Sequence, residues 1–421
     1  MIVAPQSYMS LTERTYLSSG QQEHAMCMSV VALEHCPSSR LGGQELSLLD
    51  VTRYLAHRGH KIILLYVTDG DLLQEYSAFC AQLIKVSGYS ISPRHRIQDI
   101  INFLADLLRM PRSSSMLVYA NQYLDSLFAA ALSRLRDCPF VCHLRLPPPD
   151  VFCGQFRLGI SRANRLIAVS EQTRLDYVKR GFNPEAIDVV HNGIDVSRFP
   201  LVDYRTLRSK LGLGRDQFVV TYAGRFDPVK GVMTLLDAVE RLKRSGTACE
   251  LFLAGGTDIP PGDGLLRDHP SELRARADSL GISANTHWLG HYSDIATLFG
   301  ASDVVVLPSL WSEPFGRIII EAMACGTPVV ASRVGGITEI LSGEFRRLTF
   351  ASGNHQELAD LLGRLRNWRT EDPTLASRCR LHVMDNFDIN RTIDGIERSL
   401  LGTLQQFDSG ILPPTTLARI R

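Results

Sequence analysis

The sequence contains no apolar run that approaches the ~18 residues a helix needs to cross a membrane. Residues 1–24 have no charged segment followed by an apolar one, so they do not predict a secretory signal. The nine cysteines are scattered and include no CxxC pair, which argues against a disulfide framework or a zinc cluster. These absences predict a cytoplasmic protein with reduced thiols and without a membrane-spanning helix.

Two common nucleotide-binding patterns are also missing. No GxGxxG follows a predicted strand, which argues against a nicotinamide dehydrogenase. Lys230 is followed by glycine and not by Ser or Thr, so it does not belong to a Walker A loop. The net charge of +1 gives no reason to expect a nucleic-acid partner. The chain has 421 residues, 45% of them hydrophobic and 21% charged, which indicates a globular protein of two domains.

Short apolar runs alternate with helical patterns along the chain, which is typical of an α/β protein with doubly wound parallel sheets. The predicted strands are 27–33, 61–67, 116–120, 140–144, 165–170, 187–191, 217–224, 251–254, 286–289, 304–307, 328–331 and 347–351. Late helices are predicted at 355–368 and 389–404. The expected organisation is an extension at 1–24, a first domain at 25–200, a second domain at 201–385, and a crossover helix with a tail at 386–421. A polar loop of unknown purpose spans 258–271.

The stretch 304–341 carries the most chemical information. Glu313 precedes a predicted helix and Glu321 lies inside it, with seven residues between them. The start of that helix exposes the backbone amides of Phe315, Gly316 and Arg317 as hydrogen-bond donors. Carboxylates and free amides together suit a hydroxyl-rich, electron-rich ligand such as a nucleotide sugar. Read singly, the two glutamates could equally be a solvated helix residue and a partner of the helix dipole.

Arg225 and Lys230 lie between the strand 217–224 and the next helix, where two cations could hold an anion. Two solvated surface charges are the plain alternative. Gly42 and Gly43 lie at the first strand-to-helix junction, where glycines allow a ligand to approach the backbone closely. An ordinary turn explains the pair more simply.

His143 lies near the end of the strand 140–144, the edge at which parallel sheets bind their ligands. The alternative is a buried histidine bonded to a backbone carbonyl. Arg145 follows it and could meet a charged acceptor, although a solvated surface arginine is the simpler expectation.

Two longer patterns contain these residues: GRxxxxKG, which starts at Gly224, and ExFGxxxxEAMAxGxPVxxSxxGGxxE, which starts at Glu313. Together they resemble the retaining glycosyltransferases of family 4, which have the GT-B fold. The resemblance implies two Rossmann-like domains that face each other across a cleft. It implies that Glu313 contacts the donor sugar and that Glu321 binds the ribose. It assigns Arg225, Lys230 and the Gly42–Gly43 pair to the donor diphosphate, and places His143 near the donor sugar.

The implied activity is transfer of a hexosyl-type sugar from a nucleotide-diphosphate sugar, with retention, without a metal and without a cofactor. The acceptor is left open among a sugar, a lipid-linked molecule and a small molecule, and so is peripheral contact with a membrane.

Asp69-Gly70-Asp71 matches the metal-binding DxD of the GT-A fold, but a turn after a strand explains it. A sugar-nucleotide epimerase of the same fold and a non-catalytic nucleotide-sugar-binding protein are the alternatives; the epimerase needs acid–base carboxylates in the first half of the chain, of which the sequence shows no convincing set.

Overall fold

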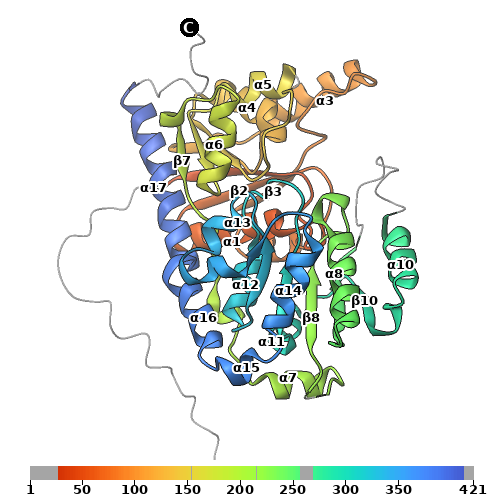
Figure 1. The fold of residues 1–421 in the computed structure, drawn as a ribbon. Coiled ribbons are helices and arrows are strands. Elements are labelled where there is room, and N and C mark those ends of the chain that lie inside the picture. The colour runs from red at the N-terminus through yellow and green to blue at the C-terminus, as the bar shows by residue number, and fades with distance from the viewer. Residues whose placement is uncertain (1–26, 153, 215, 257–268, 412–421) are drawn as a thin grey trace, which may run out of the picture.

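The computed structural model describes residues 27–152, 154–214, 216–256 and 269–411. Two parallel sheets form the centres of two α/β domains, one above the other in Figure 1. The predicted fold class, two doubly wound Rossmann-like domains, is confirmed. The predicted extension at 1–24 lies outside the described residues. So does the loop of unknown purpose up to residue 268, while its last residues begin a helix.

The first sheet has the order β3-β2-β1-β4-β5-β6-β7, and every pair of neighbouring strands is parallel. Its strands are β1 Ser29–Glu34, β2 Lys61–Tyr66, β3 Gln82–Lys85, β4 Met116–Ala120, β5 Phe140–Leu144, β6 Arg165–Ala168 and β7 Ile187–Val189. The helices of this part are α1 Gly43–His57, α2 Leu73–Ser77, α3 Arg96–Arg109, α4 Ser126–Arg136, α5 Gly154–Ile160 and α6 Glu171–Lys179. The central strands are buried on both faces, which explains their nearly continuous apolar sequences.

The second sheet has the order β10-β9-β8-β11-β12-β13, again parallel. Its strands are β8 Val219–Ala223, β9 Glu250–Ala254, β10 Thr286–Gly290, β11 Val304–Leu307, β12 Val329–Ser332 and β13 Thr349–Phe350. The helices are α7 Tyr204–Lys210, α8 Val232–Arg244, α10 His269–Ser279, α11 Ile295–Ala301, α12 Arg317–Ala324, α13 Ile337–Ile340, α14 His355–Arg364, α15 Trp368–Glu371 and α16 Leu375–Asn386. In both sheets the strand order reverses beside the first strand of the domain, the point at which such sheets bind ligands.

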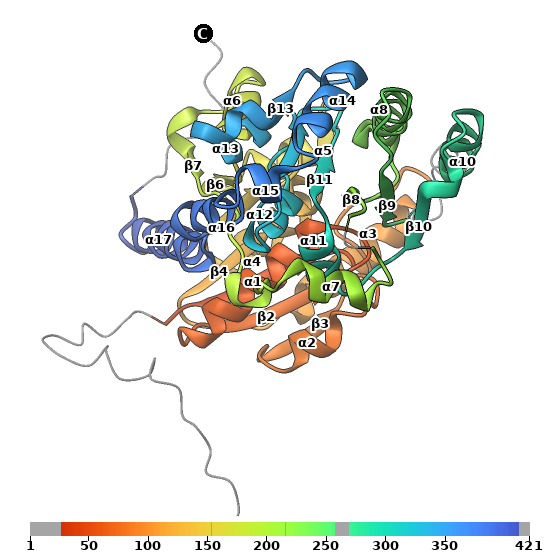
Figure 2. The same cartoon turned by 60° about the horizontal axis from the view of Figure 1, so that its bottom comes forward.

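The last helix, α17 Ile389–Asp408, returns to the first domain. Ile393, Ile396 and Leu400 on this helix are buried in the same core cluster as residues of β1, β2 and α1. Figure 2 shows α17 beside α16 at the side of the molecule. The helix α17 therefore packs against the first domain, although it follows the second domain in the sequence. Within the described residues, no helix is long and apolar enough to span a bilayer.

Two predictions of secondary structure were wrong. The strand β3 was missed because it is four residues long, lies at the sheet edge and is only partly buried, so its apolar run is limited to Leu83 and Ile84. The helix predicted at 355–368 ends at Arg364, and a separate short helix begins at Trp368. The indole of Trp368 is buried and donates a hydrogen bond to the carbonyl oxygen of Asp303, 2.9 Å away. This tertiary contact is not visible in the local pattern.

Candidate functional site

Lys230 and Glu313 form a nearly buried ion pair at the edge of the second sheet. Lys230 ends the short 3-10 turn Pro228–Lys230 that follows β8, and Glu313 lies in the loop after β11. The Lys230 Nζ atom is 2.7 Å from Glu313 Oε2, and the two side chains are 14% and 11% exposed. The same carboxylate oxygen accepts hydrogen bonds from Ser309 and from the indole of Trp311. Two of the predicted site residues are thus brought into direct contact.

The surroundings of Glu313 keep it ionised. Burial by itself would raise the pKa of this carboxyl, but the ammonium of Lys230 and the donors of Trp311 and Ser309 outweigh burial and hold the pKa below its ordinary value. The Lys230 ammonium also lies 5.0 Å from the centre of the Trp311 ring. A fixed cation beside a fixed carboxylate offers both an anion site and an acceptor for hydroxyl groups.

A second buried ion-pair network joins the two domains through the side chain of Arg317. Its Nε atom lies 2.7 Å from Glu321 Oε1, and its Nη2 atom lies 2.8 Å from Asp50 Oδ2 on α1. Its Nη1 atom donates to the hydroxyl of Ser47. Burial alone would lower the pKa of Arg317, but the carboxylates of Asp50 and Glu321 raise it, so the guanidinium stays charged. The sequence predicted a role only for the backbone amide of Arg317; the cross-domain role of its side chain was missed.

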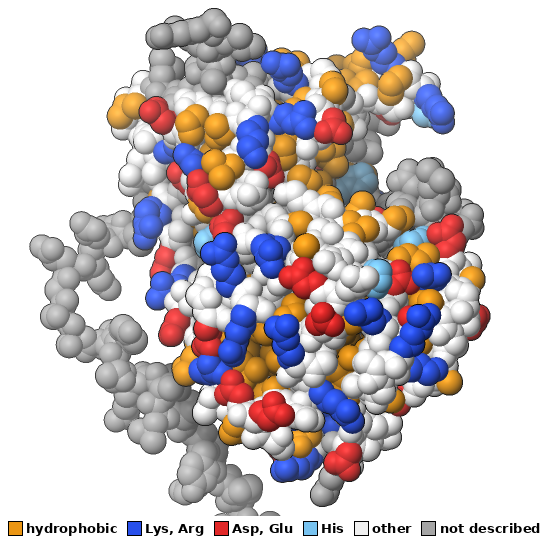
Figure 3. All heavy atoms as spheres, in the orientation of Figure 1, with side chains coloured by type: hydrophobic (Ala, Val, Ile, Leu, Met, Phe, Trp, Pro, Cys, Tyr) orange, Lys and Arg blue, Asp and Glu red, His pale blue; other side chains and the backbone are white. Residues whose placement is uncertain are grey.

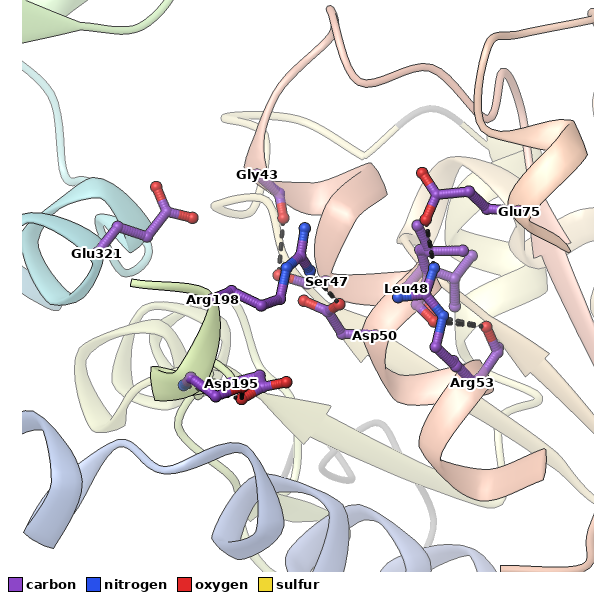
Figure 4. Close-up of polar contacts among 12 residues, drawn as sticks. Gly43, Ser47, Leu48, Asp50, Arg53, Glu75, Asp195, Arg198 and Glu321 are labelled. Atoms are coloured by element: carbon purple, nitrogen blue, oxygen red, sulfur yellow. Dashed lines mark hydrogen bonds and ion pairs between the residues drawn. The ribbon is translucent and has the colours of Figure 1, made fainter. Parts of the chain in front are cut away.

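Figure 4 shows Ser47 and Asp50 on α1 facing Arg198, with the carboxylate of Glu321 directed toward the same place. Arg198 Nη1 lies 3.2 Å from the second oxygen of Asp50. The sequence contained one signal for this network. A cation at the first residue of a helix opposes the helix dipole, so Arg317 at that position needed a compensating partner.

The predicted glycines lie beside this network. Gly42 precedes α1 with φ 150°, and Gly43 is the first residue of the helix. A Cβ atom at Gly43 would lie 3.3 Å from the side chain of Arg317. The absence of a side chain at Gly43 therefore lets Arg317 reach Asp50. The structure gives Gly43 this packing role within the protein, and its contact with the donor diphosphate stays a prediction.

Arg225 is half-buried, and its charge lowers the pKa of Glu45 on α1, although burial raises that pKa overall. The charge of Arg225 therefore acts on a carboxyl group of the first domain. Phe315 is buried and lies 6.0 Å from the ring of His191. Gly316 immediately precedes α12 with φ 100°, a conformation that favours glycine.

Glu339, the last residue of the quoted pattern, also holds the domains together. Its carboxylate accepts hydrogen bonds from the backbone amides of Glu171 and Gln172 at the start of α6. It also lies 2.8 Å from His191 Nε2. The hydroxyl of Ser170 donates to the carbonyl oxygen of Pro314, 2.7 Å away. The loop that carries Glu313 is therefore fastened to the first domain.

His143 is not in contact with the residues described so far. It is fully buried on β5, where a hydrogen bond joins its Nδ1 atom to the hydroxyl of Tyr119. Its Nε2 atom is buried and has no hydrogen-bond partner among the described residues. Burial, helped by the charge of Arg145, lowers the pKa of His143 well below its ordinary value, so the ring is neutral at pH 7.

The expectation that Arg145 is a solvated surface residue was wrong. Arg145 is 6% exposed, and it donates to the side-chain oxygens of Asn121 and Asn192. Its Nη2 atom is buried and has no hydrogen-bond partner among the described residues. The nearby carboxyl of Glu34, at the end of β1, is bound by Asn121.

Three buried carboxyl groups gather at this edge of the first sheet. Burial, together with the carboxyls of Glu45 and Asp125, raises the pKa of Glu34 well above its ordinary value. Burial has the same effect on the pKa of Asp125. The sequence analysis found no such set, because Asp125 is far from Glu34 and Glu45 in the chain and approaches them only in the folded domain.

The side chains of Asp69 and Asp71 form contacts within the protein. Asp71 accepts a hydrogen bond from the amide of Ser39 and Asp69 pairs with Lys85. A Cβ atom at Gly70 would lie 2.1 Å from the carbonyl oxygen of Pro37. Across the described residues, no three His, Cys, Asp or Glu side chains are grouped so as to hold a metal ion.

Comparison with solved structures shows the same architecture. The Anabaena protein HepE, crystallised with UDP and glucose, superposes with a TM-score of 0.75 at 25% identity and covers 89% of this chain and 100% of its own. Sucrose-phosphate synthase from Thermosynechococcus elongatus gives a TM-score of 0.72 at 23% identity, over 91% of this chain and 100% of its own. At this lower identity, the similarity to sucrose-phosphate synthase supports the fold alone.

Comparison of sequences gives relatives with narrower coverage. The D-inositol 3-phosphate glycosyltransferase of Mycobacterium tuberculosis is 41% identical over 193 residues, which are 45% of this chain and 38% of that protein. The matched stretch is therefore well under half of the relative's length.

Two family models match adjoining parts of the chain. The model for Glycosyltransferase Family 4 matches residues 41–198, and the model for Glycosyl transferases group 1 matches residues 203–375. These matches fall on the two α/β domains in turn. With the two parallel sheets and the fold shared with HepE, they show that the chain belongs to the family 4 glycosyltransferases of GT-B fold.

Proposed function

We propose that this protein transfers a sugar from a nucleotide-diphosphate sugar to an acceptor, with retention of configuration at the anomeric carbon. The observation that carries the proposal is the nearly buried pair of Lys230 and Glu313, with Arg225 half-buried in the loop between β8 and Lys230. Breaking the glycosidic bond places negative charge on the leaving diphosphate. Fixed cations in a site with little water stabilise that charge, which is usually the largest contribution to such catalysis.

In this proposal, Glu313 binds hydroxyl groups of the donor sugar and Glu321 binds the ribose. Glu313 is ionised and Glu321 is held in place by Arg317, so both carboxylates are prepared to accept hydrogen bonds. The HepE crystals contain UDP and glucose, and a UDP-sugar is therefore the first donor to test. The acceptor would enter beside the first domain, near the carboxyl ends of β1, β4 and β5.

The direct test is a panel of UDP-, GDP- and ADP-sugars with candidate acceptors, scored by release of the nucleoside diphosphate. We expect one nucleotide class to support release, and NMR of the product to show the anomeric configuration of the donor. A matched Glu313→Gln variant removes the carboxylate charge and should lose activity. An inverted product would contradict retention, and binding of donors without any turnover would favour a binding protein.

The carboxyl cluster of Glu34, Glu45 and Asp125 favours one second candidate, a sugar-nucleotide epimerase. Raised pKa values suit proton transfer, and this set is what such an activity requires in the first domain. Incubation of the nucleotide sugar without acceptor distinguishes the two. If NMR shows inversion at a carbon of the donor sugar, the result supports the epimerase. An unchanged donor supports glycosyl transfer.

We expect Glu321→Ala to weaken binding of the free nucleoside diphosphate by roughly 1.5–3 kcal/mol, the usual contribution of a charged hydrogen bond. Isothermal calorimetry measures this directly. Glu321→Gln keeps an oxygen for Arg317 and should lose less, and Glu371→Ala, at an exposed site on α15, serves as the control. Unchanged affinity in Glu321→Ala would remove the ribose role.

We also expect activity to survive chelation. Lys230 and Arg225 supply positive charge for the diphosphate, and the carboxylates of the DxD sequence are engaged with Ser39 and Lys85. Turnover is measured in EDTA with and without added manganese. Loss of turnover in EDTA that manganese restores would assign a metal to the reaction and contradict this prediction.

A further inference from the structure

The helix α3 carries a continuous apolar stripe on its exposed side. The stripe is defined by five side chains, with their exposed fractions: Ile97 78%, Ile100 37%, Ile101 55%, Leu104 53% and Leu108 71%. Four of them follow the spacing i, i+4, i+7, i+11, which places them on one face of a helix over about 16 Å. Single exposed apolar residues are normal, but a continuous stripe of large ones marks a contact surface.

The stripe faces outward because the other side of α3 is fixed to the domain. Phe103 and Leu107 are buried, and the Phe103 ring packs edge-on against Phe128 of α4 at 5.1 Å. Asp106 accepts a hydrogen bond from the amide of Ser87. The stripe is therefore apolar surface in addition to the face that the core requires.

Positive charge surrounds the stripe. Arg94 and Arg96 at the start of α3 and Arg112 after its end are exposed, and within the described residues no ion pair is formed by any of them. The carboxylates of α3 are engaged elsewhere: Asp99 accepts from the amide of Ser92, and Asp106 pairs with Arg109. In Figure 3, apolar and basic side chains gather on the lobe at the upper right, where Figure 1 shows α3.

We propose that α3 binds the surface of an anionic lipid bilayer. The stripe would enter the boundary between headgroups and acyl chains, and the flanking arginines would contact anionic headgroups. Charge complementarity favours this occupant. A second copy of the chain would bring the same arginines face to face, which opposes association. The inference concerns binding alone and does not depend on the proposed catalytic activity.

The experiment is sedimentation of the full-length protein with phosphatidylcholine vesicles, with and without phosphatidylglycerol. We expect binding to the anionic vesicles, weaker binding to neutral ones, and a decrease as salt is raised. The variant Ile101→Asp/Leu104→Asp should reduce the affinity at least about tenfold, because two apolar contacts are lost and negative charge is added. Leu381→Asp/Met384→Asp on α16 is the matched control, with the same spacing and exposed fractions of 52% and 46%.

Circular dichroism and thermal unfolding establish that the variants are folded. Anionic vesicles that fail to bind the wild-type protein would overturn the proposal, as would equal loss of binding in the α16 control. Light scattering decides the remaining alternative. A wild-type dimer that the α3 variant converts to a monomer would assign the stripe to contacts between copies and would also overturn it.

Discussion

Replacing Lys230 by alanine should lower kcat by roughly 10²–10³, the usual cost of losing one group that stabilises a developing negative charge. In the proposed reaction, the charge on the diphosphate grows as the glycosidic bond breaks. The Lys230 ammonium should therefore act more strongly on the transition state than on the bound donor, and kcat should fall more than KM rises. Steady-state turnover with the active nucleotide sugar measures both constants.

A lysine in a loop usually buries little area, so its replacement would ordinarily leave the fold almost unchanged. The structure requires a different expectation. Lys230 neutralises Glu313, which is 11% exposed at its side chain, so its removal leaves a nearly buried carboxylate without its ion pair. We expect a loss of about 3 kcal/mol in the free energy of unfolding, seen as a lower Tm.

The double variant Lys230→Ala/Glu313→Gln separates the two effects. It removes the unpaired charge and should recover most of the Tm, while activity stays low. Lys230→Arg should recover turnover only in part, since a guanidinium is larger and planar. Lys243→Ala, an exposed lysine on α8 that bonds a backbone carbonyl, is the control and should keep wild-type kcat. A folded Lys230→Ala enzyme with wild-type kcat would mean that the diphosphate is held elsewhere.

Replacing Arg317 by methionine should destabilise the protein by about 3–5 kcal/mol, because it breaks a buried network of ions and leaves charge unpaired. Asp50 is 2% and Glu321 7% exposed. Of its two ion-pair partners among the described residues, Asp50 would keep Arg198, at 3.2 Å. We also expect the KM for the donor to rise, since Glu321 loses the side chain that orients it. Thermal unfolding and donor titration measure the two effects.

Neutralising the partners provides the critical comparison. Arg317→Met/Asp50→Asn/Glu321→Gln removes all three buried charges and leaves unpaired only Arg198, whose side chain is 48% exposed to water. It should regain much of the lost Tm, but not the donor affinity. Arg333→Met breaks an ion pair whose side chains are 47% and 37% exposed, and it should cost less than about 1 kcal/mol. Equal effects of Arg317→Met and Arg333→Met would show that the cross-domain network contributes little.

The sequence by itself determined the fold class and most of the strands. Parallel strands buried on both faces have continuous apolar sequences with turns between them, and this signal is local. It also singled out Glu313, Lys230, Arg225 and Glu321, because two long patterns place these residues at strand-to-helix junctions. The strand β3 escaped prediction because an edge strand that is half exposed has no such signal.

Only the tertiary structure decided which residues meet across the domains. Asp50 and Arg317 are far apart in sequence, as are Glu339 and the start of α6, and no local pattern relates them. The burial of Arg145, the carboxyl cluster around Glu34 and the outward stripe of α3 were hidden for the same reason. Whether an arginine or a leucine is covered depends on what the rest of the chain packs against it, and that is a property of the assembled domains.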